Sequence, residues 1–197
     1  GAEVGTITLQ DLARRRVPGF DFDSAWRAVQ PDDVVTLIYT SGTTGPSKAV
    51  QLTHGSVLFQ TRGVAAILGL QADGRSISYL PSAHVGDRCL THYGASLCFG
   101  NSVTSIPDHR QVGLALVEVR PTVFGGVPRV WEKLKAGLEA AGVTDPTKLP
   151  EQAKAAVRAK TGLDKTGWRI TAAAPISTEV LQYFAALGLE LNEGWGM

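Results

Sequence analysis

The chain reads VVTLIYTSGTTGPSK over residues 34–48, where a β-branched, apolar run precedes hydroxyl residues, two glycines and a lysine. The run is typical of a β-strand. The segment from Tyr39 to Lys48 has the composition of a phosphate-binding loop, because glycines let the backbone approach a ligand, hydroxyls and amides donate hydrogen bonds, and lysine supplies positive charge. It is not a Walker A loop, since Ser47-Lys48-Ala49 lacks the second glycine and the metal-binding hydroxyl of that pattern. We therefore expect a nucleotide-phosphate site of another kind after the first strand.

Composition and charge narrow the class of protein. The chain has 197 residues, of which 44% are hydrophobic and 19% charged, as is ordinary for one globular core. A net charge of +1 indicates no nucleic-acid or anionic-membrane partner. No stretch approaches the ~18 consecutive apolar residues of a transmembrane helix. We therefore expect a globular protein that has no transmembrane segment.

The cysteines and histidines predict neither a disulfide nor a metal centre made of side chains alone. Cys89 and Cys98 fall in one expected helix, which holds them roughly 13 Å apart, too far to bridge. His54, His92 and His109 have no metal-ligand spacing with each other or with the cysteines. Reduced cysteines favour a cytoplasmic protein. A peripheral membrane association of the full-length protein stays open.

Strand and helix patterns alternate along most of the chain. Strands are expected at 34–40, 76–80, 102–106, 122–124, 168–172 and 189–192, and helices from 53, 85, 111, 128, 151 and 178 onward. This alternation predicts the α/β class, a mostly parallel sheet covered by helices on both faces. Residues 1–30 are expected to be a peripheral helical and extended lead-in, and residues 31–197 to form the α/β unit. Ligands bind such sheets at the carboxyl ends of the strands, so the loops after residues 40, 80, 124, 172 and 192 are expected on one rim.

Four further segments carry distinctive patterns. They are Leu80-Pro81-Ser82-Ala83-His84 with Arg88 four residues on, Pro128-Arg129-Val130-Trp131-Glu132-Lys133, Thr171-Ala172-Ala173-Ala174-Pro175, and Asn192-Glu193-Gly194-Trp195-Gly196-Met197. With the loop at 39–50 they resemble, in the same order, the signatures of the adenylate-forming (AMP-binding) enzymes: acyl-CoA synthetases, aryl-CoA ligases, luciferases and peptide-synthetase adenylation domains. The segments at His84 and Pro128 most resemble the long-chain fatty acyl-CoA synthetases.

The resemblance implies a set of site residues at the strand ends. Those expected to bind the cofactor are Thr40, Ser41, Gly42, Thr43, Thr44, Gly45, Lys48, Ala173, Ala174, Pro175, Glu193, Gly194, Trp195 and Gly196. Lys48 and His84 are the expected catalytic residues, Lys48 at the phosphates and His84 at the carboxylate and acyl end. Thr40 is the expected Mg²⁺ ligand. The small residues 173–175 let the backbone approach adenine, and Trp195 offers a flat face on which adenine stacks.

Plainer explanations stay open for three of these features. His84 is equally typical of a helix cap or a core residue, and alanines at 172–174 are equally typical of tight packing between helix and strand. A buried interface tryptophan is the plainer explanation of Trp195. These alternatives differ in burial and hydrogen bonding, so a structure distinguishes them.

The resemblance implies an ATP-dependent acid–thiol ligase. A carboxylic acid, with long-chain fatty acids favoured, reacts with Mg·ATP to give acyl-adenylate and pyrophosphate, and coenzyme A then displaces AMP. The expected cofactors are ATP, Mg²⁺ and coenzyme A, and the expected partners are the acid and the remainder of the enzyme, including its C-terminal domain. The ribose-binding aspartate, the Mg²⁺ glutamate and the C-terminal lysine of such enzymes are not located in this chain. We expect a central part of the large N-terminal domain that alone binds nucleotide weakly and does not turn over.

Three other functions remain as alternatives. The first is a stand-alone adenine-nucleotide-binding module without ligase activity. The second is an aryl or medium-chain acid–CoA ligase. The third is an unrelated phosphotransferase that releases ADP.

Overall fold

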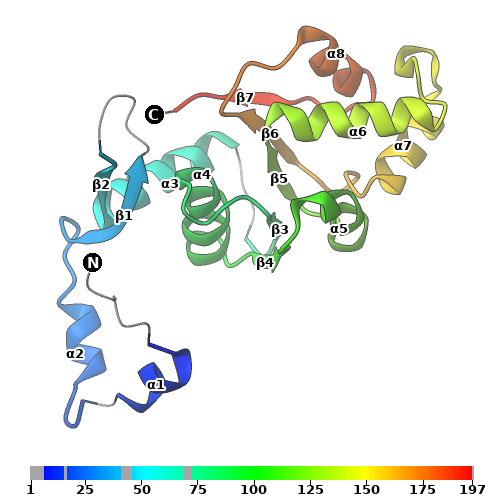
Figure 1. The fold of residues 1–197 in the computed structure, drawn as a ribbon. Helices are drawn as coiled ribbons and strands as arrows, with labels where there is room; N and C mark the ends of the chain where they lie inside the picture. Colours follow the sequence, from blue (N-terminus) through cyan, green and yellow to red (C-terminus); the bar gives the residue numbers. More distant parts are fainter. Residues whose placement is uncertain (1–6, 16, 41–45, 69–71, 197) are drawn as a thin grey trace.

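The computed structural model describes residues 7–15, 17–40, 46–68 and 72–196, and Figure 1 shows how its elements are arranged. Two short helices open this part of the chain, α1 (Leu9–Arg14) and α2 (Phe22–Arg27). Asp21 caps α2, because its carboxylate accepts a hydrogen bond from the backbone N–H of Ser24 at 3.0 Å. Figure 1 shows both helices beyond the β1–β2 hairpin, away from the strands of the larger sheet.

The first expected strand belongs to a hairpin. β1 (Val34–Thr40) pairs antiparallel with β2 (Lys48–Thr53), in a register that sets Thr40 opposite Lys48. The expectation that β1 joins the parallel strands is therefore wrong, and β2 was not predicted. The side chains of β2 are mostly exposed, so no buried face marks this segment as a strand, and its pairing with β1 defines it.

Helix α3 (His54–Leu68) begins where the sequence predicts. The Thr53 hydroxyl accepts from the backbone N–H of Ser56 at 3.2 Å, and the Ser56 hydroxyl accepts from that of Thr53 at 3.1 Å. This reciprocal bonding satisfies two donors at the helix start.

Strands β3 (Arg75–Ser78) and β4 (Ser102–Ser105) pair in parallel and are joined by a helical segment. The sequence predicts one helix from residue 85 to residue 99. The structure has a short α-turn, α4 (Val85–Asp87), followed by a π-helix, η1 (Arg88–Cys98). A Cβ on Gly94 would lie 2.4 Å from the Cys89 carbonyl oxygen, so this close approach of backbone requires glycine. The wider helix therefore depends on a contact that helical periodicity does not reveal.

The larger sheet has the order β5 (Val123–Gly126), β6 (Trp168–Ala172), β7 (Asn192–Gly194), with both pairings parallel. The last strand begins three residues later than expected. The helices around it are η2 (His109–Gln111), α5 (Val112–Val119), α6 (Pro128–Ala140), η3 (Pro146–Lys148), α7 (Glu151–Lys160) and α8 (Thr178–Ala186). β3 lies beside β5. Tyr79, the residue after β3, donates a hydrogen bond from its hydroxyl to the Gly125 carbonyl of β5 at 2.8 Å.

An aromatic cluster forms the centre of the core. Trp131 of α6 is fully buried, and its ring meets Phe124 of β5 at 5.3 Å and Phe184 of α8 at 5.2 Å, edge to face in both pairs. Figure 1 shows α6 and α8 on one side of the β5–β6–β7 sheet. The fold is α/β, as predicted, and apart from the hairpin every described strand pairing is parallel. Across the described ranges, no helix has the length and apolarity needed to cross a bilayer.

Candidate functional site

The hairpin carries the two described residues that flank the predicted phosphate loop. Thr40 ends β1 and Lys48 begins β2, directly opposite each other, and the Thr40 hydroxyl makes a long contact of 3.5 Å with the Lys48 carbonyl oxygen. Both side chains are exposed. Ser41, Gly42, Thr43, Thr44 and Gly45 lie outside the described residues. The structure therefore brings Thr40 and Lys48 together at the base of this loop.

His84 is an exposed helix cap. It precedes α4, and its Nδ1 accepts a hydrogen bond from the backbone N–H of Gly86 at 3.0 Å. An accepting Nδ1 places the proton of a neutral imidazole on Nε2. The capping explanation is therefore correct, and it leaves Nε2–H as a donor of the kind that binds a carboxylate.

Arg88 joins the His84 segment to the hairpin. Its Nε donates to the Ser82 carbonyl at 2.6 Å, and its Nη1 donates to the Thr36 hydroxyl of β1. Sequence reasoning used this arginine only as a branch marker, because its partner Thr36 is 52 residues away in the chain. The contact sets the two sequence-predicted segments side by side.

The predicted adenine-side segments meet at the carboxyl ends of two neighbouring strands. Ala172 of β6 pairs with Gly194 of β7, so the turn at 173–175 and the segment at 193–196 leave the sheet together. Ala173 has φ +76°, a left-handed conformation that costs energy for a residue with a Cβ. Ala173, Ala174 and Pro175 are all exposed, which is the arrangement expected where backbone approaches a ligand.

Trp195 is 86% exposed in the described chain. Its neighbour Gly194 is closely packed. A Cβ at this position would lie 2.5 Å from Ile170 Cδ1 and 3.6 Å from Ala172 Cβ. Close packing at 194 thus fixes the backbone from which the tryptophan projects.

Replacing Gly194 by alanine tests this packing. In Gly194→Ala we expect a loss of about 1 kcal/mol of stability, because the added methyl forces the end of the Ile170 side chain to move. The thermal unfolding midpoint should be lower by roughly 2 to 4 °C. Gly196→Ala is the matched control, because nothing lies within 4 Å of a Cβ at that position. Equal midpoints for the two variants would contradict the close approach.

The described residues offer little for a metal ion. Within these ranges no group of three or more His, Cys, Asp or Glu side chains is arranged to hold one. The Thr40 hydroxyl is a single exposed oxygen. One protein oxygen is compatible with Mg²⁺, which takes most of its ligands from phosphates and water when it accompanies a nucleotide.

A comparison with known protein families shows which family the chain belongs to. Residues 6–197 match the sequence profile of the family described as AMP-binding enzyme. The chain belongs to this family.

Individual relatives of the chain bear the names of fatty-acid–CoA ligases. The chain is 42% identical over 230 residues to a protein named as fatty-acid–CoA ligase fadD11 in Mycobacterium tuberculosis, covering 98% of the chain and 40% of that protein. It is 30% identical over 219 residues to long-chain-fatty-acid–CoA ligase ACSBG2 of Xenopus laevis, covering 92% of the chain and 30% of that protein. The chain thus spans at most about 40% of the length of these relatives.

A solved structure in the same family supports the fold. The chain superposes on the inhibitor-bound N-terminal domain of FACL13 from Mycobacterium tuberculosis with a TM-score of 0.61 and 28% identity, covering 84% of the chain and 37% of that domain. The α/β architecture described above is therefore that of part of the N-terminal domain of an adenylate-forming enzyme.

Proposed function

We propose that the full-length protein activates a fatty acid with ATP to an acyl-adenylate and then transfers the acyl group to coenzyme A. The observation that carries the proposal is the meeting of two distant segments at the ends of β6 and β7. There the exposed Trp195 follows Gly194, which pairs with Ala172 directly before the small-residue turn. A flat aromatic face beside accessible backbone suits an adenine ring. Membership of the AMP-binding family supports this reading.

The phosphate end of the proposed site lies on the hairpin. Lys48 is the cation for the triphosphate and the departing pyrophosphate, with the residues 41–45 as further hydrogen-bond donors. Thr40 would hold Mg²⁺ together with the phosphates, and the ion would neutralise their charge. No side chain has to become a nucleophile, because the substrate carboxylate itself attacks the α-phosphorus.

The acid end of the proposed site lies at the His84 turn. His84 Nε2–H is a donor for one carboxylate oxygen, and its orientation is set by the Gly86 hydrogen bond. Arg88 fastens this turn to β1, the strand that leads to the phosphate loop. Acid and triphosphate are thereby held by connected parts of the chain, as an in-line attack requires.

The substrate class follows from the relatives and the sequence. Both curated relatives described above bear names of fatty-acid–CoA ligases, and one is named for long-chain acids. The segments at His84 and Pro128 resemble that branch as well. We therefore propose a long-chain fatty acid as substrate, residues 31–197 as the AMP-binding unit, a cytoplasmic location, and a partnership with a C-terminal domain of the full-length protein.

Acid-dependent exchange of pyrophosphate into ATP tests the proposal. The full-length protein is assayed with long-chain, medium-chain and aromatic acids, and the fastest exchange is expected with long-chain fatty acids. Exchange with aromatic or medium-chain acids alone would change the substrate class. Nucleotide binding without exchange would favour the binding module, and release of ADP would favour a phosphotransferase.

Trp195 provides a specific prediction for nucleotide affinity. In Trp195→Ala we expect the Kd for AMP to rise about 10-fold, because an aromatic stacking surface is lost. Trp195→Phe retains a ring and should bind within about threefold of the parent protein. Isothermal titration calorimetry with AMP measures both. Unchanged affinity in Trp195→Ala would remove this residue from the site.

A further inference from the structure

Asp87 is a buried carboxylate next to the proposed acid site. Its side chain is 1% exposed, although it stands three residues after the exposed His84. The Ser78 hydroxyl donates to both carboxylate oxygens, at 3.0 and 3.2 Å. His92 Nε2 lies 3.4 Å from one of these oxygens. The backbone carbonyl of Asp87 is occupied as well, because it accepts from the Thr91 hydroxyl at 2.5 Å.

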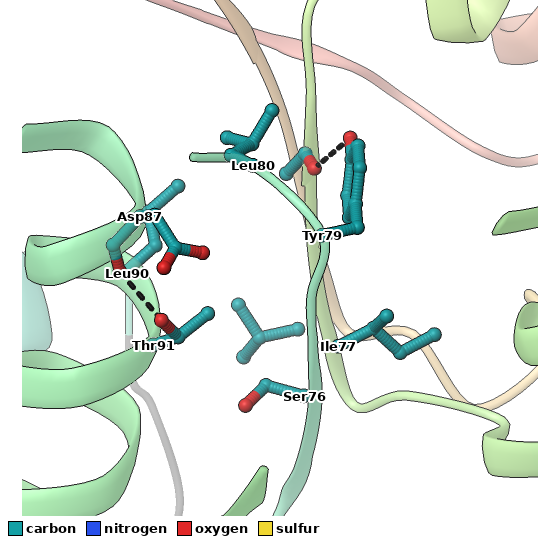
Figure 2. A pocket seen from close by; sticks show the side chains of 9 residues that line it. Ser76, Ile77, Tyr79, Leu80, Asp87, Leu90 and Thr91 are labelled. Atoms are coloured by element: carbon teal, nitrogen blue, oxygen red, sulfur yellow. Dashed lines mark hydrogen bonds between the residues drawn. The ribbon is translucent and has the colours of Figure 1, made fainter. Parts of the chain in front are cut away.

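A small cavity lies beside this carboxylate. Its volume is about 20 Å³, and among its lining residues are Ser76, Tyr79, Asp87 and Thr91. Figure 2 shows Asp87 projecting from the helix into the space in front of β3. Burial, and next the charge of Asp87, raise the pKa of the Tyr79 phenol. A space of this size has room for about one water molecule.

Burying a carboxylate is unfavourable unless its partners compensate. Within the described residues the partners of the Asp87 carboxylate are one hydroxyl and a histidine whose own side chain is 48% exposed. An apolar residue would fill such a position between helix and sheet at lower cost. A buried carboxylate at this position therefore points to a role beyond filling the core.

The geometry indicates what the Ser78–Asp87 hydrogen bond holds. Ser78 is the last residue of β3 and Asp87 the last of α4, so the bond joins the two ends of the segment 79–86. This segment carries His84 at its exposed side. Arg88 follows Asp87 directly and reaches outward to Thr36. The Ser78–Asp87 hydrogen bond holds the turn against β3, and the hydrogen bond from Arg88 to Thr36 holds it against the hairpin.

We propose that Ser78 and Asp87 are positioning residues that hold the His84 turn in the orientation needed to bind the substrate carboxylate. This inference rests on the proposed function, because it assigns the acid to His84. The pair acts on the acid and leaves the adenine side untouched, since Trp195 and the turn at 173–175 belong to other strands.

Steady-state pyrophosphate exchange by the full-length protein tests the proposal through the two KM values. In Ser78→Ala and Asp87→Ala we expect KM for the acid to rise about 10-fold, because a displaced turn misplaces His84. KM for ATP should change by less than about twofold. Ser78→Thr keeps the hydroxyl donor and should restore the KM for the acid to within about threefold.

Ser76→Ala is the matched control. Ser76 lies on the same strand and the same face as Ser78 and is also buried, but its hydroxyl makes only a 3.5 Å contact with the Ser102 carbonyl. Both KM values should stay within about twofold in this variant. A Ser78→Ala protein that unfolds, or in which both KM values rise together, would show that the pair only maintains the fold and would overturn the proposal.

The reactivity of His84 supplies a readout that needs no activity. Diethyl pyrocarbonate modifies an imidazole nitrogen that has a free lone pair, and in this structure the Gly86 N–H occupies the Nδ1 lone pair. Peptide mass spectrometry should show modification of His84 about fivefold faster in Ser78→Ala than in Ser76→Ala. Equal rates would overturn the positioning role. Absence of exchange with every acid in the parent protein would instead refute the proposed function, while the modification rates still decide the positioning role.

Discussion

Replacing Lys48 by alanine should slow adenylate formation about 10²- to 10³-fold, the range found when one preorganised charge-stabilising group is removed. Lys48 begins β2, and in the proposed reaction it is the cation at the phosphates, with no catalytic nucleophile to compensate for its loss. ATP affinity should fall as well, by about 10-fold, because a charge-assisted contact to phosphate is lost. Single-turnover formation of acyl-adenylate and equilibrium binding of ATP measure the two effects separately.

Lys165→Ala is the control for this experiment, since Lys165 is exposed and lies in the loop that precedes β6. It should leave the rate and the affinity within about twofold of the parent protein. If Lys48→Ala leaves both quantities unchanged, the hairpin loop does not bind the triphosphate and its assignment is wrong.

Replacing Trp131 by alanine should give the largest loss of stability. Trp131 is fully buried between Phe124 and Phe184, and its indole Nε1 donates to the Ile170 carbonyl at 3.2 Å. Truncation leaves a large cavity and removes the hydrogen bond to Ile170, at a cost of about 3–5 kcal/mol. Differential scanning calorimetry should show that the midpoint temperature of unfolding is lowered by roughly 6 to 20 °C.

Trp195→Ala is the informative comparison, because it removes the same side chain from an exposed position. It should change the unfolding midpoint by no more than about 2 °C and act on nucleotide affinity instead. A midpoint for Trp131→Ala within that same margin would contradict the central place of the aromatic cluster in the core.

The alternation of elements was predictable because core-facing side chains repeat with helical or strand periods. Trp131 and Leu134 recur at helical spacing in α6, and β-branched residues mark β1. The β1–β2 pairing was not predictable in this way. Lys48–Thr53 is short and mostly exposed, and its pairing with the neighbouring β1 is what defines it as a strand. The π-helix similarly depends on the close approach at Gly94.

In the candidate site, too, some features could be predicted from the sequence and others could not. The ends of β6 and β7 were placed correctly because a parallel sheet gathers the carboxyl ends of its strands. The links around His84 were missed because they are side-chain contacts between residues distant in sequence. Arg88 reaches Thr36 in the hairpin, and Asp87 has its partner at the end of β3. Sequence patterns thus predict where a site lies more readily than what holds its residues in position.

The transfer of oxygen from acid to nucleotide tests the central claim most directly. The full-length protein is incubated with ATP, coenzyme A and a long-chain fatty acid labelled with ¹⁸O in its carboxylate, and the nucleotide product is analysed by mass spectrometry. Attack of the carboxylate on the α-phosphorus leaves one carboxylate oxygen on the phosphate, so the account predicts AMP that carries one ¹⁸O atom. Unlabelled AMP, or ADP with the label in inorganic phosphate, would contradict adenylate formation.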